Sequence, residues 1–195
     1  MKNKQKAQPA NESLSYSVVV RDKKGRVLQR ISAPSHCFVE QWNQIINIQA
    51  KQGNYTVRQT DGTTFGAAPR SRSMDIISGI GETDIGLRVG KGFTPVAIDD
   101  FALETPLAEG VGVDEFNHQA GTYTAPAVVG TTCSFTVTRI FVNNSGATIS
   151  GIREIGAYMD MDWRFGLAWR DVLPGAVNIP DGGSITVTYT IPVTV

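Results

Sequence analysis

The stretch Ile185-Thr-Val-Thr-Tyr-Thr-Ile-Pro-Val-Thr-Val195 decides the fold class of this chain. Apolar residues occupy every odd position, and Thr or Pro occupies every even position. Because successive strand residues point to opposite faces, this alternation predicts a strand with one buried face and one solvated, Thr-rich face. Pro192 cannot donate to a ladder, which predicts an edge position or a bulge at that point. The stretch therefore predicts an all-β sandwich or barrel.

Further strands are predicted wherever alternating or β-rich segments recur, at 14–20, 27–31, 55–60, 74–77, 85–89, 135–142, 148–159 and 165–170. Turn signals separate several of them, as at Asp22-Lys-Lys-Gly25, Asn143-Asn-Ser-Gly146 and Asp181-Gly-Gly183. Many short strands with regular turns predict an all-β fold, an antiparallel β-sandwich that is jelly-roll-like. No internal repeat or boundary divides the chain, so residues 13–195 are expected to form a single domain.

One segment has a helical period instead. Its apolar stripe recurs every three to four residues and comprises Phe38, Trp42, Ile45 and Ile46, with the polar Gln49 at the next position of this spacing. Ser35 is the candidate N-cap, and Gln52-Gly-Asn54 ends the pattern. The segment predicts one amphipathic helix near 36–50, packed across an open face or end of a sheet.

Composition narrows the function. Charged residues make up 18% of the 195 residues, below the ~25% typical of globular proteins, and the net charge is zero. The basic residues form no stripe, which argues against specific nucleic-acid binding. A neutral, weakly charged surface is better tolerated by a subunit packed in an assembly than by a free monomer.

Neither the cysteines nor the N-terminal residues give a sign of a secreted or membrane-spanning protein. Cys37 and Cys133 are expected to be small buried apolar residues, with a single bridge left open as the alternative. Residues 1–12 carry no secretory signal, and no apolar run approaches the ~20 residues of a membrane-spanning helix. The expectation is synthesis in the cytoplasm, with no membrane partner.

Two segments have no fold pattern of their own. Residues 1–12 form either a frayed tail or an extended N-terminal arm that orders against a neighbouring subunit, and we favour the arm. Residues 90–113 form a long, acidic segment with Gly and Pro, and such a connection is usually functional or covers a neighbour. Both segments are predicted to lie against other chains, because ordering them on a monomer would be costly.

Residues with catalytic or metal-binding chemistry are sparse. His36 is expected to cap or pack at the helix start and His118 to lie solvated in a loop, and neither has a second ligand at metal spacing. Motifs of serine hydrolases, zinc proteases and P-loop enzymes are absent. Gly79-Ile-Gly81 and Gly90-Lys-Gly92 are interpreted as turns between strands.

Carboxylates cluster twice along the sequence. Asp160, Asp162 and Asp171 could hold a cation but lack the pattern of a calcium loop, so a charged turn is favoured. A second cluster, of Asp99, Asp100 and Glu104, lacks the aromatic platform expected of a glycosidase. The sequence thus predicts no enzyme, with no catalytic, metal-binding or cofactor-binding residue and no cofactor.

An exposed tryptophan could stack on a sugar, so the expected positions of the three tryptophans bear on a sugar-binding function. Trp42 and Trp169 fall on patterned segments and are expected in the core, whereas Trp163 falls in a turn and is expected to be exposed.

Glu154 is the charged residue expected to be structural. It lies between Ile152 and Gly156 in a strand expected to be half-buried. A buried carboxylate requires a partner, and Arg139 and Arg153 are the candidates. On these grounds Glu154→Ala is predicted to lower stability by about 2 kcal/mol.

Two segments carry a family resemblance. The first is Ile85-Gly-Leu-Arg-Val-Gly-Lys-Gly-Phe-Thr-Pro95 with Asp99-Asp-Phe-Ala-Leu103, which resembles a strand ending in VGxG-T-P and followed by DxxL. The second runs from Phe135 to Gly156 and resembles the pattern F-N-S-G…I…E-I-G-(L/A)-Y, and the ending at 182–191 fits as well. Together they resemble virion structural proteins of tailed bacteriophages, over residues 85–195.

The resemblance implies a multi-copy structural component of the capsid, connector or tail, located in the virion and in contact with copies of itself and other virion proteins. The alternative is a host-surface glycan-binding module of a phage fibre or bacterial adhesin. Exposed aromatics on one face would favour that alternative.

Overall fold

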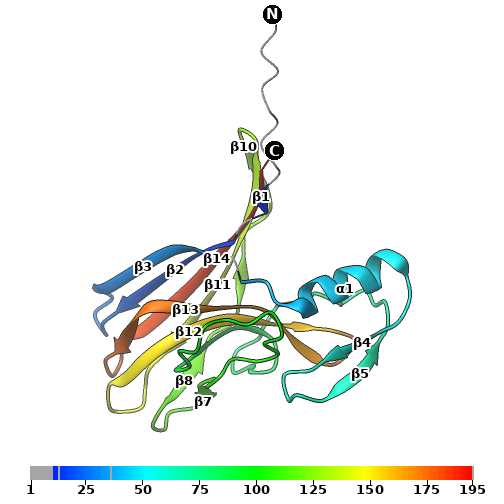
Figure 1. Cartoon of the computed structure of the whole chain (residues 1–195). Coiled ribbons are helices and arrows are strands. Elements are labelled where there is room, and N and C mark those ends of the chain that lie inside the picture. Colours follow the sequence, from blue (N-terminus) through cyan, green and yellow to red (C-terminus); the bar gives the residue numbers. More distant parts are fainter. Residues whose placement is uncertain (1–10, 13, 36, 195) are drawn as a thin grey trace, which may run out of the picture.

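The computed structural model describes residues 11–12, 14–35 and 37–194, and it confirms an all-β sandwich with one helix (Figure 1). Strands make up 51% of the structure and helix 7%. The expectations for residues 1–10 and for His36 lie outside the described residues.

The larger sheet has the strand order β3-β2-β14-β11-β8-β7, and all of its pairings are antiparallel except β7 with β8. Its main strands are β2 (Leu14–Arg21), β3 (Val27–Ser35), β7 (Ala108–Glu109), β8 (Glu115–His118), β11 (Thr132–Val142) and β14 (Ser184–Thr194). Three short strands lie beside this path. They are β1 (Asn11–Glu12) on β14, and β9 (Thr122–Tyr123) and β10 (Ala127–Val129) on β11.

The alternation of the C-terminal stretch matches its place in this sheet. Ile185, Val187 and Tyr189 are fully buried, while the threonines between them are half-buried. The edge position predicted from Pro192 is wrong, because β14 lies at the centre of the sheet with β11 on one side and β2 and β1 on the other. Pro192 lies opposite Ser134 of β11.

The second sheet has the order β13-β12-β6, from β13 (Phe165–Ile179), β12 (Ile149–Asp160) and β6 (Gly86–Gly90). Register shifts interrupt the β12–β13 pairing between Ile149 and Glu154 and again at Ala157. The main core cluster joins residues of both sheets, and Trp169 of β13 meets Tyr189 of β14 with ring centroids 5.5 Å apart. The predicted core position of Trp169 is confirmed.

Helix α1 (Glu40–Lys51) lies beside the hairpin of β4 (Tyr55–Arg58) and β5 (Thr64–Ala67) at one end of the sandwich (Figure 1). Its predicted start near 36 and the Ser35 N-cap are wrong: Ser35 still pairs with Leu14 in the β2–β3 ladder, and Val39 is the N-cap. Ile46, expected in the buried stripe, is 41% exposed, and the fully buried helix positions are Gln41, Ile45 and Ile48.

Aromatic packing attaches the helix to the second sheet. Phe38 stacks on Trp42 at 4.7 Å, and both rings contact Trp169 at 5.9 and 5.7 Å. Trp42 is half-buried rather than fully in the core as predicted.

Short strands were harder to predict than long ones. The strand expected at 74–77 is wrong, since this segment runs as turns and loop with Ile77 exposed, while β5, β7, β8, β9 and β10 were not predicted. Cys37 and Cys133 form no disulfide bridge; Cys37 is half-buried and Cys133 exposed, so the expectation of two buried residues is wrong. Within the part of the chain that the structure describes, no helix is long and apolar enough to cross a membrane.

A β-ribbon projects beyond the sandwich (Figure 1). It comprises residues 124–136 and 190–194 with β1, that is, β10, the start of β11 and the end of β14. None of its described residues in 124–136 or 190–194 is buried, whereas Val137 and Tyr189 at its base are. We call this feature the projecting ribbon.

Candidate functional site

The carboxylate of Glu154 on β12 is the centre of a buried polar network. Its side chain is fully buried, and Oε1 accepts hydrogen bonds from the backbone N–H groups of Gly92 at 3.0 Å and Thr105 at 2.7 Å. Oε2 accepts from the N–H of Glu104 at 2.9 Å and from Nε of Arg170 at 2.9 Å. The carboxylate is thus fully hydrogen-bonded, as a buried charge requires.

Arg170 of β13 is the partner that the sequence did not identify. Its guanidinium also binds Asp100 through Nη1 at 2.9 Å and Glu104 through Nη2 at 3.4 Å. Burial alone would lower the pKa of this guanidinium, but hydrogen bonds and charge from Glu154 and Asp100 raise it above its usual value. The predicted partners, Arg139 and Arg153, are wrong.

The other carboxylates of the network bind the backbone of residues 90–107. Glu104 Oε2 accepts the N–H groups of Phe93 at 2.9 Å and Thr94 at 3.0 Å, and the hydrogen bonds from Thr94 lower the pKa of Glu104. Asp100 accepts the N–H of Ala97 at 3.0 Å. The Asp99, Asp100 and Glu104 cluster of the sequence is therefore only partly assembled: two members contact Arg170, and Asp99 is exposed.

The network joins the two segments that carry the family resemblance. Gly92 and Leu103 belong to the first, and their N–H groups bind Glu154 of the second and the Tyr158 hydroxyl just after it. Gly92 also has a steric reason to be glycine, because a Cβ there would lie 2.7 Å from Cδ of Glu154.

These contacts correct the premise that a neighbouring chain is needed to order residues 90–113. The same chain supplies the hydrogen-bond acceptors for residues 92–105, and Leu103 and Leu107 are buried. Contact of this segment with another copy stays a prediction.

A second buried arginine organises the neighbouring loop. Arg139 of β11 is fully buried and donates to the backbone carbonyls of Gly79, Glu82, Ile85, Leu87 and Gln119 at 2.7 to 3.5 Å. Burial, followed by the positive charge of Arg88, lowers the pKa of Arg139 to about 10, so it remains protonated at neutral pH. All of these acceptors are backbone carbonyl groups, so Arg139 has a structural role in holding the loop.

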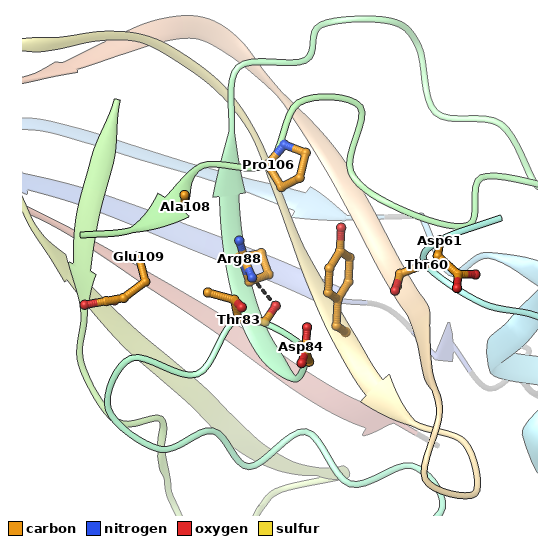
Figure 2. Close-up of a pocket in the computed structure, with 9 residues that line it drawn as sticks. Thr60, Asp61, Thr83, Asp84, Arg88, Pro106, Ala108 and Glu109 are labelled. Atoms are coloured by element: carbon orange, nitrogen blue, oxygen red, sulfur yellow. Dashed lines mark hydrogen bonds between the residues drawn. The ribbon is translucent and has the colours of Figure 1, made fainter. Parts of the chain in front are cut away.

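Arg88 lines a polar depression of about 550 Å³ beside Tyr158 (Figure 2). It is 4% exposed, and its two Nη groups donate to the carbonyls of Thr83 and Leu107. Figure 2 shows Asp61 and Glu109 at opposite sides of the depression. A third carboxylate, Asp84, also lines the depression.

His118 is not a solvated loop residue as predicted. It lies fully buried on β8, with its ring edge-on to Phe141 at 5.0 Å. Burial, together with the charges of Arg88 and Arg139, lowers its pKa to about 4. A neutral, buried imidazole packed on a phenyl ring is a core residue.

The remaining carboxylates are also bound by the fold. Asp160 accepts the N–H groups of Asp162 and Trp163 at 2.9 Å each, which is the charged turn that the sequence favoured. Asp171 instead accepts the Tyr189 hydroxyl at 2.8 Å. Among the described residues, no group of three His, Cys, Asp or Glu side chains could hold a metal ion.

A neutral polar surface lies over α1 and β4. A depression of about 300 Å³ is lined by Asn43, Gln44, Asn47 and Tyr55, and a second, of about 460 Å³, by Asn54, Tyr55, Thr56 and Gly66. The Tyr55 ring, 47% exposed, is common to both, and Lys51 Nζ lies 5.7 Å from its centroid. Trp163 is 67% exposed as predicted, but it lies in the turn after β12 and lines neither depression.

The projecting ribbon is the third surface with functional character. Val128 and Val129 of β10 are 72% and 79% exposed, and Val193 of β14 is 47% exposed. Neighbouring strand residues point to opposite faces, so both faces of the ribbon expose apolar side chains. The sequence carried one signal of this surface that was missed: residues 122–138 contain no charged residue.

The described residues include a polar depression, a neutral aromatic surface and the projecting ribbon, and the buried charges of Glu154, Arg170 and Arg139 serve the fold. No family model, no curated protein and no solved structure matches this chain.

Proposed function

We propose that this protein is a non-enzymatic structural subunit of a bacteriophage virion, present in many copies in the capsid, connector or tail. The observation that carries the proposal is the projecting ribbon, which extends beyond the sandwich without a buried residue in 124–136. A ribbon that exposes valines on both faces gains its stabilising burial from another molecule.

The charge distribution supports the same conclusion. Glu154, Arg170 and Arg139 are buried and hold loops in place, and Glu104 and Asp100 bind the same loop. The weakly charged exterior that remains suits a subunit covered by its neighbours. The resemblance of residues 85–195 to virion structural proteins favours a virion over other assemblies, and synthesis in the host cytoplasm would precede incorporation.

Self-assembly tests this proposal. We expect the purified full-length chain to form closed multi-copy assemblies as its concentration rises, because surfaces left open on one copy are covered by the next. Light scattering after size-exclusion chromatography measures the mass, and negative-stain microscopy shows the symmetry. A chain that stays monomeric at the highest soluble concentration contradicts the proposal.

Glycan binding is the second candidate function, favoured by the surface around Tyr55. An aromatic ring packs against the C–H face of a sugar, and planar amides such as those of Asn43 and Asn47 pair with hydroxyl groups. The residues that line both depressions are uncharged, which favours a neutral sugar, with Lys51 beside the shared Tyr55 ring.

A titration with glucose, galactose and N-acetylglucosamine, followed by amide chemical shifts, tests this candidate. Shifts confined to α1 and β4 are expected, and Tyr55→Ala should weaken binding by about tenfold through loss of the ring contact. Trp163→Ala is the matched control, since it removes another exposed aromatic and should leave the shifts unchanged. If the Tyr55 and Trp163 variants behave alike, this surface is not a sugar site.

A further inference from the structure

The projecting ribbon has two edges of different character. Its strands lie in the order β10-β11-β14-β1, and among the described residues β10 pairs with β11 alone. The β1 edge carries the charged residue Glu12, whereas the β10 edge is neutral. Exposed strand edges of monomeric proteins are commonly protected by charged side chains, and the β10 edge lacks this protection.

In β10, the backbone N–H and C=O groups of Val128 are available for pairing with another strand. Gly130 and Thr131 form a two-residue loop, with Gly130 at φ 60°, between the register partners Val129 and Thr132. Residues that flank such a loop exchange hydrogen bonds, and the bonded and non-bonded pairs then alternate. Val128 therefore directs its N–H and C=O away from β11, toward the open edge. Its side chain is 72% exposed.

The lack of charge favours a second copy as the occupant of this edge. An interface with two-fold symmetry sets each residue against its own counterpart, so any charge near the axis would meet a like charge. Residues 122–138 and β14 contain none. The Glu12 edges would lie on the far sides of the pair, three strand spacings or about 14 Å from β10 in each copy.

We infer that the β10 edges of two copies of this chain pair antiparallel about a two-fold axis at Val128; this rests on the proposed multi-copy function and specifies how two subunits meet. Val128 exchanges two backbone hydrogen bonds with Val128 of the second copy. Gly130 N–H of each copy donates to the Pro126 carbonyl of the other, and Pro126, which has no N–H, limits the ladder at that end.

The pairing adds only a few residues to each ribbon. A contact of this size is weak between free monomers, and it becomes populated where neighbouring subunits hold the ribbons at high effective concentration. The inference therefore applies to the full-length chain in its assembled state.

Disulfide trapping tests the register. In a Cys133→Ser background, Ala127→Cys and Val129→Cys are made as separate proteins and mixed during assembly. Around an axis at Val128, residue 127 of one copy lies directly opposite residue 129 of the other, at about 4.5 Å between Cα atoms. Like positions are diagonal neighbours at about 7–8 Å, too far to bridge. We expect the mixed disulfide in the mixture and no disulfide in either protein alone, measured by mass spectrometry of the crosslinked peptide.

A charge at the axis tests the edge itself. Adding Val128→Lys to both cysteine proteins should lower the mixed-disulfide yield by about tenfold or more, because two lysines would meet across the axis. Ile80→Lys is the control, at an apolar residue that is 78% exposed and lies outside the ribbon and outside residues 90–113, and it should leave the yield unchanged. A wild-type chain that assembles while the mixture gives no mixed disulfide overturns this inference and leaves the proposed function standing. A wild-type chain that never assembles overturns both.

Discussion

Replacing Glu154 with alanine is expected to lower the free energy of unfolding by about 4 kcal/mol, as losses of one partner of a buried ion pair do. The substitution leaves three backbone N–H groups, of Gly92, Glu104 and Thr105, without their acceptor. It also leaves Nε of the buried Arg170 guanidinium without its acceptor, while Asp100 and Glu104 still pair with its Nη groups. Chemical denaturation monitored by tryptophan fluorescence measures the change.

This expectation is larger than the 2 kcal/mol predicted from the sequence, since the structure shows four hydrogen bonds on one carboxylate. Glu154→Gln retains one carbonyl oxygen and should lose about half as much stability. Asp99→Ala is the matched control, an exposed carboxylate of the same loop whose loss should change stability by less than about 0.5 kcal/mol. Equal stabilities for the Glu154 and Asp99 variants would show that the network does not support the fold.

The sequence predicted the long strands because their burial is one-sided. In β14, the apolar positions Ile185, Val187 and Tyr189 all face the core, and the period of two is read directly from the residues. Short strands such as β8 and β10 span three or four residues and are held by pairing with β11. β8 pairs with the distant end of β11, whereas β10 pairs with the start of β11 across a two-residue loop, and both strands are too short for a period of two to be recognised.

The partner of Glu154 was missed for a related reason. Glu154 lies opposite Val172 on β13, and Arg170 is two residues from Val172 on the same face, so the ion pair is a diagonal cross-strand contact. The register that creates it follows irregularities between Ile149 and Glu154. A single displaced residue would exchange the faces of the strand. Sequence reasoning could therefore predict a buried Glu154 but not its partner.

The predicted start of the helix was wrong because Ser35 takes part in a β-strand pairing instead of capping the helix. Ser35 and Pro34 have the local chemistry of a helix entrance, but both pair with β2, through Leu14 and Ser15. Tertiary pairing outweighed a cap that is worth about 1 kcal/mol. The helix then begins after Val39, where Phe38 and Trp42 reach Trp169.

The second large effect is expected at Arg139, where substitution by methionine should destabilise the fold by about 3 kcal/mol. Methionine fills much of the same space, so the loss reports the carbonyl groups of Gly79, Glu82, Ile85, Leu87 and Gln119 that lose a donor. Removing a buried charge recovers some desolvation energy, since burial already lowers the pKa of Arg139 to about 10. The orphaned carbonyls outweigh that gain because each one is a buried acceptor left unsatisfied.

Two measurements separate this effect from a general loss of packing. Hydrogen exchange should accelerate first in residues 79–90, the segment whose carbonyls Arg139 binds, before the remaining strands lose protection. Arg139→Lys, which keeps the charge but has one ammonium in place of the branched guanidinium, should recover less than half of the lost stability. Arg30→Met, at an exposed position of β3, controls for removal of an arginine and should change stability by less than about 0.5 kcal/mol. Uniform exchange across the chain, or equal effects at Arg30 and Arg139, would contradict the role of Arg139 as the donor that holds this loop to the sheet.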